Sequence, residues 1–285
     1  MGPAPLISVV IATRNAARSL PRCLESLRAQ TFRDFEVLVM DGGSTDGTLD
    51  LLKASGDLVA AWRSGPDGGT YSAWNAALPL ARGEWVCFLG ADDRLWDAGS
   101  LERLVPHLRG ALPRYRVVYG RLRQVDEAGR EIEELGRPWP EFRARFLAHD
   151  CLPHPGLMHH RSLFERHGGF DESFRIAADY EFLLRELVAG EALFVPELVV
   201  RAGWGGLSTS PENFAASLEE IERALRMHGL KPPFPKWPFW KLLARAYLGL
   251  HALVGRERAR RLADLYRALT LRKPRYAARR GDPAQ

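Results

Sequence analysis

The sequence has few cysteines and no long apolar run. Its 285 residues include three cysteines, Cys23, Cys87 and Cys151, which lie far apart and match no spacing of a metal or redox motif. Sparse thiols of this kind favour a reducing compartment over secretion. No stretch reaches the roughly 18 uninterrupted apolar residues that a transmembrane helix needs. We therefore expect a globular, cytoplasmic protein.

The first apolar run, residues 6–12, also lacks the features of a signal peptide. No basic region precedes it and no small-residue cleavage site follows it, so we interpret it as a β-strand. Further strands are predicted at 35–40, 58–62 and 85–89, separated by helices that begin near residues 19, 48 and 70, the last of them running to 81. This alternation predicts a Rossmann-like α/β fold, with a mostly parallel central sheet and helices on both faces.

The second half of the chain mixes element types. We expect strands at 117–120 and 193–200, a hairpin over 126–136, helices at 177–187 and 212–227, and a loop over 154–160. A proline-rich break at residues 231–235 is the predicted domain boundary. The expected organisation is therefore one domain over residues 1–230, followed by a basic helical extension over 231–285.

The basic charge is concentrated in that extension. Residues 231–285 carry 14 Lys and Arg against 3 Asp and Glu, whereas the other 230 residues carry 26 against 32. Together with an apolar and aromatic face, this charge suits the surface of an anionic membrane. We expect peripheral contact with the inner face of the cell membrane through residues 236–280. The alternative is a helical hairpin packed on the body, and no recognisable module predicts nucleic-acid binding.

Two adjacent carboxylates follow the strand at 85–89. Asp92 and Asp93 stand where a buried strand ends, and burying two carboxylates is costly unless a cation meets them. Hard oxygen ligands suit Mg²⁺ or Mn²⁺, and such an ion often carries a phosphate. The alternative is that Asp92 caps a turn.

Polar groups also follow the other predicted strands. Residues 13–15 follow the first strand, Asp41 the second and residues 66–69 the third. In an open α/β sheet, ligands bind beyond the carboxyl ends of the strands. Any one of these groups is explained by ordinary turn chemistry, but four of them at one edge predict a ligand site.

Five segments in this order resemble the family 2 glycosyltransferases of the GT-A fold. They are residues 7–15 (ISVVIATRN), 41–48 (DGGSTDGT), 66–71 (PDGGTY), 83–85 (GEW) and 91–93 (ADD). The resemblance spans about residues 5–210. It implies inverting transfer of a sugar from a nucleotide-sugar donor, a UDP-sugar foremost, to a hydroxyl of a glycan or lipid-linked glycan. Polysaccharide, lipopolysaccharide or glycolipid synthesis is the expected setting.

The resemblance also implies residue roles. Asp93 would bind Mn²⁺ or Mg²⁺, and Asp179 would be the catalytic base. His154 is a candidate contact to metal or diphosphate, and Trp204 to the acceptor. Gly90 stands where many relatives carry a further aspartate. The expected nucleotide contacts are Thr13, Arg14, Asn15, Asp41, Asp67, Gly68, Asn75, Ala91 and Asp92.

Three alternatives remain open. Asp179 near a helix start is also placed to be an N-terminal cap. A nucleotidyltransferase shares the strand–loop–carboxylate pattern, but residues 13–17 lack the glycine-rich, lysine-containing loop that we would expect after its first strand. A non-catalytic scaffold that binds nucleotide or membrane is the third, and the joint presence of Asp41, Asp93 and Asp179 argues against it.

Overall fold

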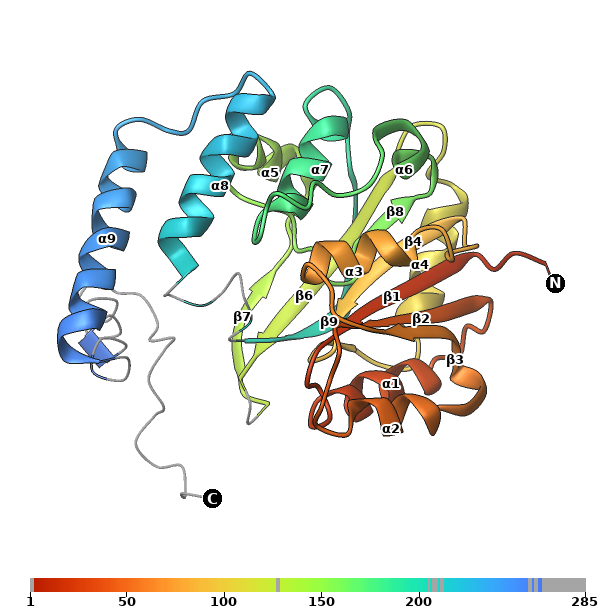
Figure 1. The fold of residues 1–285 in the computed structure, drawn as a ribbon. Helices are drawn as coiled ribbons and strands as arrows, with labels where there is room; N and C mark the ends of the chain where they lie inside the picture. Colours follow the sequence, from red (N-terminus) through yellow and green to blue (C-terminus); the bar gives the residue numbers. More distant parts are fainter. Residues whose placement is uncertain are drawn as a thin grey trace.

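The computed structural model describes residues 3–126, 129–204, 206, 210, 213–255, 258 and 261–262. Within these residues a nine-stranded sheet has the order β3-β2-β1-β4-β8-β6-β9-β5, with β7 paired to β6 (Figure 1). The first four of these strands are parallel, as predicted. They are β1 (Ile7–Thr13), β2 (Phe35–Asp41), β3 (Val59–Ser64) and β4 (Trp85–Gly90).

The register of the parallel strands aligns their carboxyl ends. Thr13 of β1 stands opposite Asp41 of β2, and Ala12 stands opposite Gly90 of β4. Strands β1, β2 and β4 are almost wholly buried, which explains their near-continuous apolar sequences. The loops after these strands therefore meet at one edge of the sheet.

The second half of the sheet mixes strand directions. Strands β6 and β9 pair in parallel, whereas β5, β7 and β8 pair antiparallel to their neighbours. Two of these strands were not predicted, since β5 and β8 span two and three residues, too few to show an alternating pattern. His159 thus lies in a strand, where a loop was expected. The five strands are β5 (Arg94–Leu95), β6 (Val117–Val125), β7 (Glu131–Leu135), β8 (Met158–His160) and β9 (Leu193–Gly203).

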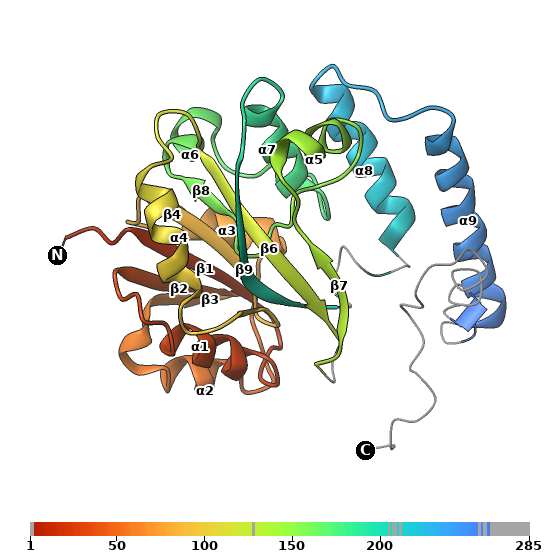
Figure 2. The ribbon, with the colours of Figure 1, turned by 180° about the vertical axis from the view of Figure 1, so that it is seen from behind.

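Helices cover both faces of the sheet, as predicted, and each face has its own apolar core (Figures 1 and 2). One face packs against α1 (Leu20–Arg28), α2 (Thr48–Lys53) and α4 (Ser100–Arg109), and the turn η1 (Gly56–Leu58) leads from α2 into β3. The other face packs against α3 (Thr70–Ala77), α5 (Trp139–Phe146), α6 (Ser162–His167) and α7 (Ala178–Leu187).

Two further helices lie beyond the sheet. Helix α8 (Phe214–Met227) packs on α7, and α9 (Lys236–Val254) packs on α8, so that α9 forms the outer end of the molecule in both views (Figures 1 and 2). Trp237 and Ala244 of α9 contact Leu218 of α8. Among the described residues, every helix is too short or too polar to cross a bilayer. Most of the basic extension after residue 255 lies outside the described residues.

Candidate functional site

A cavity of about 380 Å³ lies at the carboxyl ends of β1 and β4. Four of the predicted contact residues line it: Arg14, Asn15, Ala91 and Asp92. The remaining wall comes from Ala12, Ala16, Ser19, Thr70, Trp74, Leu89 and Gly90. The fold therefore brings together the loop after β1, the start of α3 and the carboxylate segment after β4.

Asp41 is a buried hub behind this cavity. Its carboxylate accepts hydrogen bonds from the Thr13 hydroxyl at 3.0 Å, the Ser64 hydroxyl at 2.7 Å and the backbone and side chain of Ser44. Burial alone would raise the pKa of Asp41, but these hydrogen bonds outweigh it and hold the pKa below its usual value. Asp41 is therefore a stable anion that fixes the loops after β1, β2 and β3.

The same loops are joined by Asn15. Its backbone has a positive φ of 49°, a conformation that asparagine tolerates better than most residues. Its N–H donates to the Ser44 hydroxyl at 2.7 Å, and its side-chain oxygen accepts from the N–H of Thr45 at 2.9 Å. This fixes the position of Asn15 in the cavity wall.

Asp67 and Gly68 belong to the exposed loop before α3. The Asp67 carboxylate accepts from the N–H of Gly69 at 2.9 Å and packs on Gly42, where an added Cβ would lie only 3.0 Å from a carboxylate oxygen. Glycine at position 42 therefore allows Asp67 to approach the Asp41 loop. Asp67 and Gly68 are not part of the cavity wall, and their predicted nucleotide contacts stay predictions.

The two carboxylates after β4 have different surroundings. Asp93 is 6% exposed, and it accepts from the backbone N–H of Gly90 at 2.7 Å and of Gly203 at 3.2 Å. Burial, together with the charge of Asp92, raises the pKa of Asp93 to about 7. Asp92 is exposed and forms no hydrogen bond to the described residues. Asp92 is thus the carboxylate that lines the cavity, and Asp93 is the buried one beside it in the chain.

This pair fits a divalent cation only in part. Carboxylate oxygens suit Mg²⁺ and Mn²⁺, and a cation would offset the repulsion that raises the pKa of Asp93. However, the described residues contain no group of three or more His, Cys, Asp or Glu side chains able to hold a metal. A Cβ on Gly90 would lie 2.7 Å from an Asp92 oxygen, so a third carboxylate at position 90 would require the Asp92 side chain to move. The ligand itself would have to complete the coordination.

Asp179 lies in the first turn of α7 and does not line the cavity. The Tyr71 hydroxyl, on α3, lies 3.0 Å from the Asp179 carboxylate and 2.6 Å from the carbonyl of Ile176. Tyr71 packs edge to face on Trp74, which lines the cavity. Burial raises the pKa of Asp179 to about 6, although hydrogen bonds from the Tyr180 N–H and Tyr71 lower it in part. A carboxylate with a pKa in this range is suited to general-base chemistry.

The N-terminal cap of α7 is not Asp179. The cap position is Ala177, and the N–H groups of Arg175, Ile176 and Ala177 donate to the Glu220 carboxylate of α8 at 2.8–2.9 Å. Glu220 therefore fixes the backbone that leads to Asp179. Sequence reasoning missed Glu220 and Tyr71, because no local pattern indicates contacts between such distant residues.

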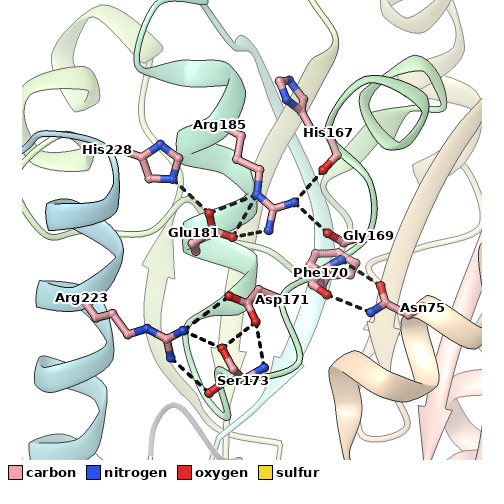
Figure 3. Close-up of polar contacts among 10 residues, drawn as sticks. All are labelled: Asn75, His167, Gly169, Phe170, Asp171, Ser173, Glu181, Arg185, Arg223 and His228. Carbon is pink, nitrogen blue, oxygen red and sulfur yellow. Dashed lines mark hydrogen bonds and ion pairs between the residues drawn. The ribbon is translucent and has the colours of Figure 1, made fainter.

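Asn75 holds a loop. Its amide nitrogen donates to the carbonyl of Phe170 at 2.9 Å, and its oxygen accepts from the N–H of Phe170 (Figure 3). The amide nitrogen also donates to Glu172 at 2.8 Å. The same loop is tied to α7 by Arg185, which pairs with Glu181 and donates to the carbonyls of residues 167 and 169 (Figure 3). The Asn75 side chain is thus occupied outside the cavity wall.

The last two predicted contacts also lie outside that wall. His154 is buried, and its ring stacks on Trp74 with centroids 5.0 Å apart. Burial lowers the pKa of His154 to about 3, which keeps the ring neutral. Trp204 follows β9 and is half-buried, and its backbone N–H donates to the carbonyl of Val125. Roles for both residues in ligand contact stay predictions.

Comparison with known proteins identifies what the chain resembles. The model of a family described as glycosyl transferase family 2 matches residues 8–167. Over 187 residues the chain is 36% identical to a "PGL/p-HBAD biosynthesis glycosyltransferase" of Mycobacterium tuberculosis, a match that covers 64% of this chain and 70% of the relative.

Two solved structures share the fold. One is the mannosyltransferase PcManGT from Pyrobaculum calidifontis in complex with GDP-Man and Mn²⁺, with a TM-score of 0.62 and 21% identity over 95% of this chain and 81% of that one. The other is S. aureus TarS 1–349 in complex with UDP-GlcNAc, with a TM-score of 0.60 and 21% identity over 76% and 66% of the two chains. Their likeness confirms the predicted GT-A architecture.

Proposed function

Because this chain belongs to glycosyl transferase family 2 and is a glycosyltransferase, we propose that it transfers a sugar from a nucleotide-sugar donor to an acceptor hydroxyl with inversion at the anomeric carbon. Membership of this family argues against the nucleotidyltransferase alternative. The observation that carries the proposal is that Asp92 and Trp74 both line the cavity, while Tyr71, the hydrogen-bond partner of Asp179, packs against Trp74.

The donor nucleotide would occupy the cavity. Arg14 and Asn15 are the proposed contacts to its base and ribose, with Thr13, Asp41, Asp67 and Gly68 holding the loops around them. A UDP-sugar is the first donor to test. GDP-sugars belong in the same panel, because PcManGT was solved with GDP-Man and TarS with UDP-GlcNAc.

Asp92 is the residue that we propose for the principal contact to Mn²⁺ or Mg²⁺. This revises the expectation from sequence, which gave that role to Asp93, because Asp93 is buried and already bonded to two backbone N–H groups. Such a cation supplies charge neutralisation at the leaving diphosphate. Asp93 would fix the backbone of Gly90 and Gly203, which flanks Asp92, and would add negative charge close to it.

Asp179 is the proposed general base. At pH 7 most Asp179 side chains would be ionised, since the pKa is about 6, and an ionised carboxylate can accept the proton of the attacking hydroxyl. The Tyr71 hydroxyl would hold the carboxylate in place. A single displacement without a covalent intermediate inverts the anomeric centre, as it does in inverting glycosidases.

The proposed acceptor is a glycan or lipid-linked glycan, in polysaccharide, lipopolysaccharide or glycolipid synthesis. The M. tuberculosis relative is named for PGL/p-HBAD biosynthesis, which supports this class of product without fixing it.

The test is a transfer and hydrolysis assay with UDP-, GDP- and dTDP-sugars, with Mn²⁺, with Mg²⁺ and with chelator. We expect metal-dependent release of nucleoside diphosphate from one donor class, and Asp179→Asn should abolish transfer while nucleotide affinity is retained. Asp57→Asn is the matched control, because Asp57 is fully exposed. Nucleotide binding without turnover of any donor would instead support the non-catalytic scaffold.

We also propose that α9 rests on an anionic membrane. Phe239, Leu242 and Leu253 are 55%, 67% and 86% exposed, and with Ala246 they recur at helical spacing on the face opposite Trp237 and Ala244. Exposed Lys236 and Arg245 flank this apolar face. The 14 basic residues of the extension provide the charge that matches anionic lipid.

A further inference from the structure

Three arginines stand side by side on adjacent strands at the edge of the sheet. Arg94 of β5 is directly opposite Arg201 of β9, and Arg201 is directly opposite Arg123 of β6. Directly opposed residues on neighbouring strands share one face of the sheet, and like charges there are destabilising. A fold that keeps such a row needs a reason for it.

Most arginines nearby have acidic partners. Arg123 pairs with Glu131 at 2.5 Å and Glu134 at 2.6 Å, and Arg103 pairs with Asp97 and Glu197, each at 2.9 Å.

Arg94 and Arg201 differ, since neither forms an ion pair with any carboxylate in the described part of the chain. The Nε of Arg201 is buried without a hydrogen-bond acceptor among those residues. Burial lowers the pKa of Arg94, and repulsion from Arg201 and Arg22 adds to that effect. No ion pair with a described residue therefore compensates the charge of Arg94 and Arg201.

Trp96 stacks with two of the three arginines, Arg201 and Arg123. The guanidinium carbon of Arg201 lies 4.0 Å from the Trp96 ring centroid, and that of Arg123 lies 4.9 Å from it. Stacking on an indole fixes the plane of a guanidinium and leaves its N–H edge free to donate. The result is a preorganised donor group, which lowers the entropic cost of binding an anion.

The row adjoins the proposed donor site but is not part of its wall. Arg94 follows Asp93 directly in sequence, and Arg201 is two residues before Gly203, whose N–H donates to Asp93. Neither arginine lines the cavity. An anion bound by these two arginines would therefore lie outside the space proposed for the nucleotide.

We propose that Arg94 and Arg201 bind an oxyanion, a phosphate or a carboxylate, that the acceptor carries. The assignment to the acceptor rests on the proposed function, whereas the assignment of an oxyanion site rests on the arginines alone. Two guanidinium forks match the paired oxygens of either group. The enzyme would thus select acidic acceptors over neutral ones.

The first experiment measures binding without turnover. Inorganic phosphate is titrated into the full chain, with and without saturating UDP, and followed by NMR or thermal shift at constant ionic strength. The double variant Arg94→Gln/Arg201→Gln should weaken phosphate binding about tenfold or more and leave UDP affinity within about twofold. Arg114→Gln, an exposed arginine paired with Glu191, is the control and should change neither affinity.

Equal phosphate affinity in the double variant and the wild type would overturn the oxyanion site. A matching loss of UDP affinity would overturn its separation from the donor site. Both results can be read even if no donor is turned over, so failure of this proposal is distinguishable from failure of the proposed function.

The second experiment distinguishes the sources of the oxyanion. Transfer is compared for three acceptors that differ in one group: a sugar phosphate ester, a uronic acid and the neutral parent sugar. The double variant should raise KM for an anionic acceptor about tenfold with little change in kcat, and donor hydrolysis should be unaffected. The preferred anionic acceptor identifies phosphate or carboxylate as the ligand.

Arg201→Lys should retain part of the preference for the anionic acceptor, since lysine keeps the positive charge but lacks the two-pronged guanidinium. An equal loss with the neutral sugar would contradict the proposal.

Discussion

The Tyr71 hydroxyl lies 3.0 Å from the Asp179 carboxylate, although 108 residues separate them in the chain. This contact joins the helix after the third strand to the helix that carries the proposed base. Tyr71 also touches Trp74 in the cavity wall. The proposed base and the cavity wall are therefore in contact with the same side chain.

Tyr71→Phe should move the pH dependence of transfer. The Tyr71 hydrogen bond favours the ionised form of Asp179, so its loss should raise the pKa of Asp179 above its present value of about 6. The acid limb of the kcat–pH profile should shift to higher pH, and the rate at pH 7 should fall. Ser72→Ala, a change in the next residue of α3, serves as the control. An acid limb that stays in place would mean that Asp179 is not the titrating base.

Asp179→Asn should stabilise the protein at neutral pH. The folded-state pKa of about 6 exceeds the usual value of about 4, so ionised Asp179 disfavours folding. This penalty is absent below about pH 4 and complete above about pH 6, where the variant should gain about 1–2 kcal/mol in free energy of unfolding. Urea unfolding at pH 4 and pH 8 measures it. A variant that is less stable at pH 8 would show that the charge is satisfied by contacts that Asn cannot replace.

Asp92→Asn and Asp93→Asn should have different effects. Asp92 faces the cavity, so its substitution should weaken Mn²⁺-dependent UDP binding by about tenfold or more. Asp93 is buried with a raised pKa, so Asp93→Asn should mainly change the pH dependence of stability. Calorimetric titration of UDP with and without Mn²⁺ tests both. The opposite result, with metal dependence lost only in Asp93→Asn, would restore the role that the sequence suggested for Asp93.

The residues of the site that follow directly from the ends of the parallel strands could be predicted from the sequence. Residues 13–15, Asp41 and Asp92 each follow an apolar strand, and parallel strands align their carboxyl ends. The two-residue strand β5 and its register with β9 leave no pattern in the sequence, so the Arg94–Arg201 pair was not predictable. Asp92 and Asp93 are adjacent, so the sequence alone does not indicate that Asp92 lines the cavity while Asp93 is buried. The Tyr71–Asp179 contact depends on the packing of whole helices.

Glu220→Gln should lower kcat without changing nucleotide affinity. The Glu220 carboxylate accepts three backbone N–H groups just before α7, and a neutral amide accepts them less strongly. The proposed base should then be less well positioned, with kcat about tenfold lower. Glu219→Gln changes the adjacent, exposed residue of α8 and is the matched control. If both variants keep the wild-type kcat, α8 does not position the base.

Leu242→Glu/Leu253→Glu should release the protein from anionic vesicles. Both leucines belong to the exposed apolar face of α9, and placing two carboxylates there removes the apolar contact and opposes the charge of the lipid. Flotation with phosphatidylglycerol vesicles, compared with pure phosphatidylcholine, measures binding of the full chain. Ala252→Glu is the control, since this exposed residue lies on α9 outside the apolar face. If the double variant floats as well as the wild type, the apolar face does not contact lipid. If Ala252→Glu is released equally, charge alone explains the binding. Release of the double variant alone would assign the contact to the side of α9 that faces away from α8.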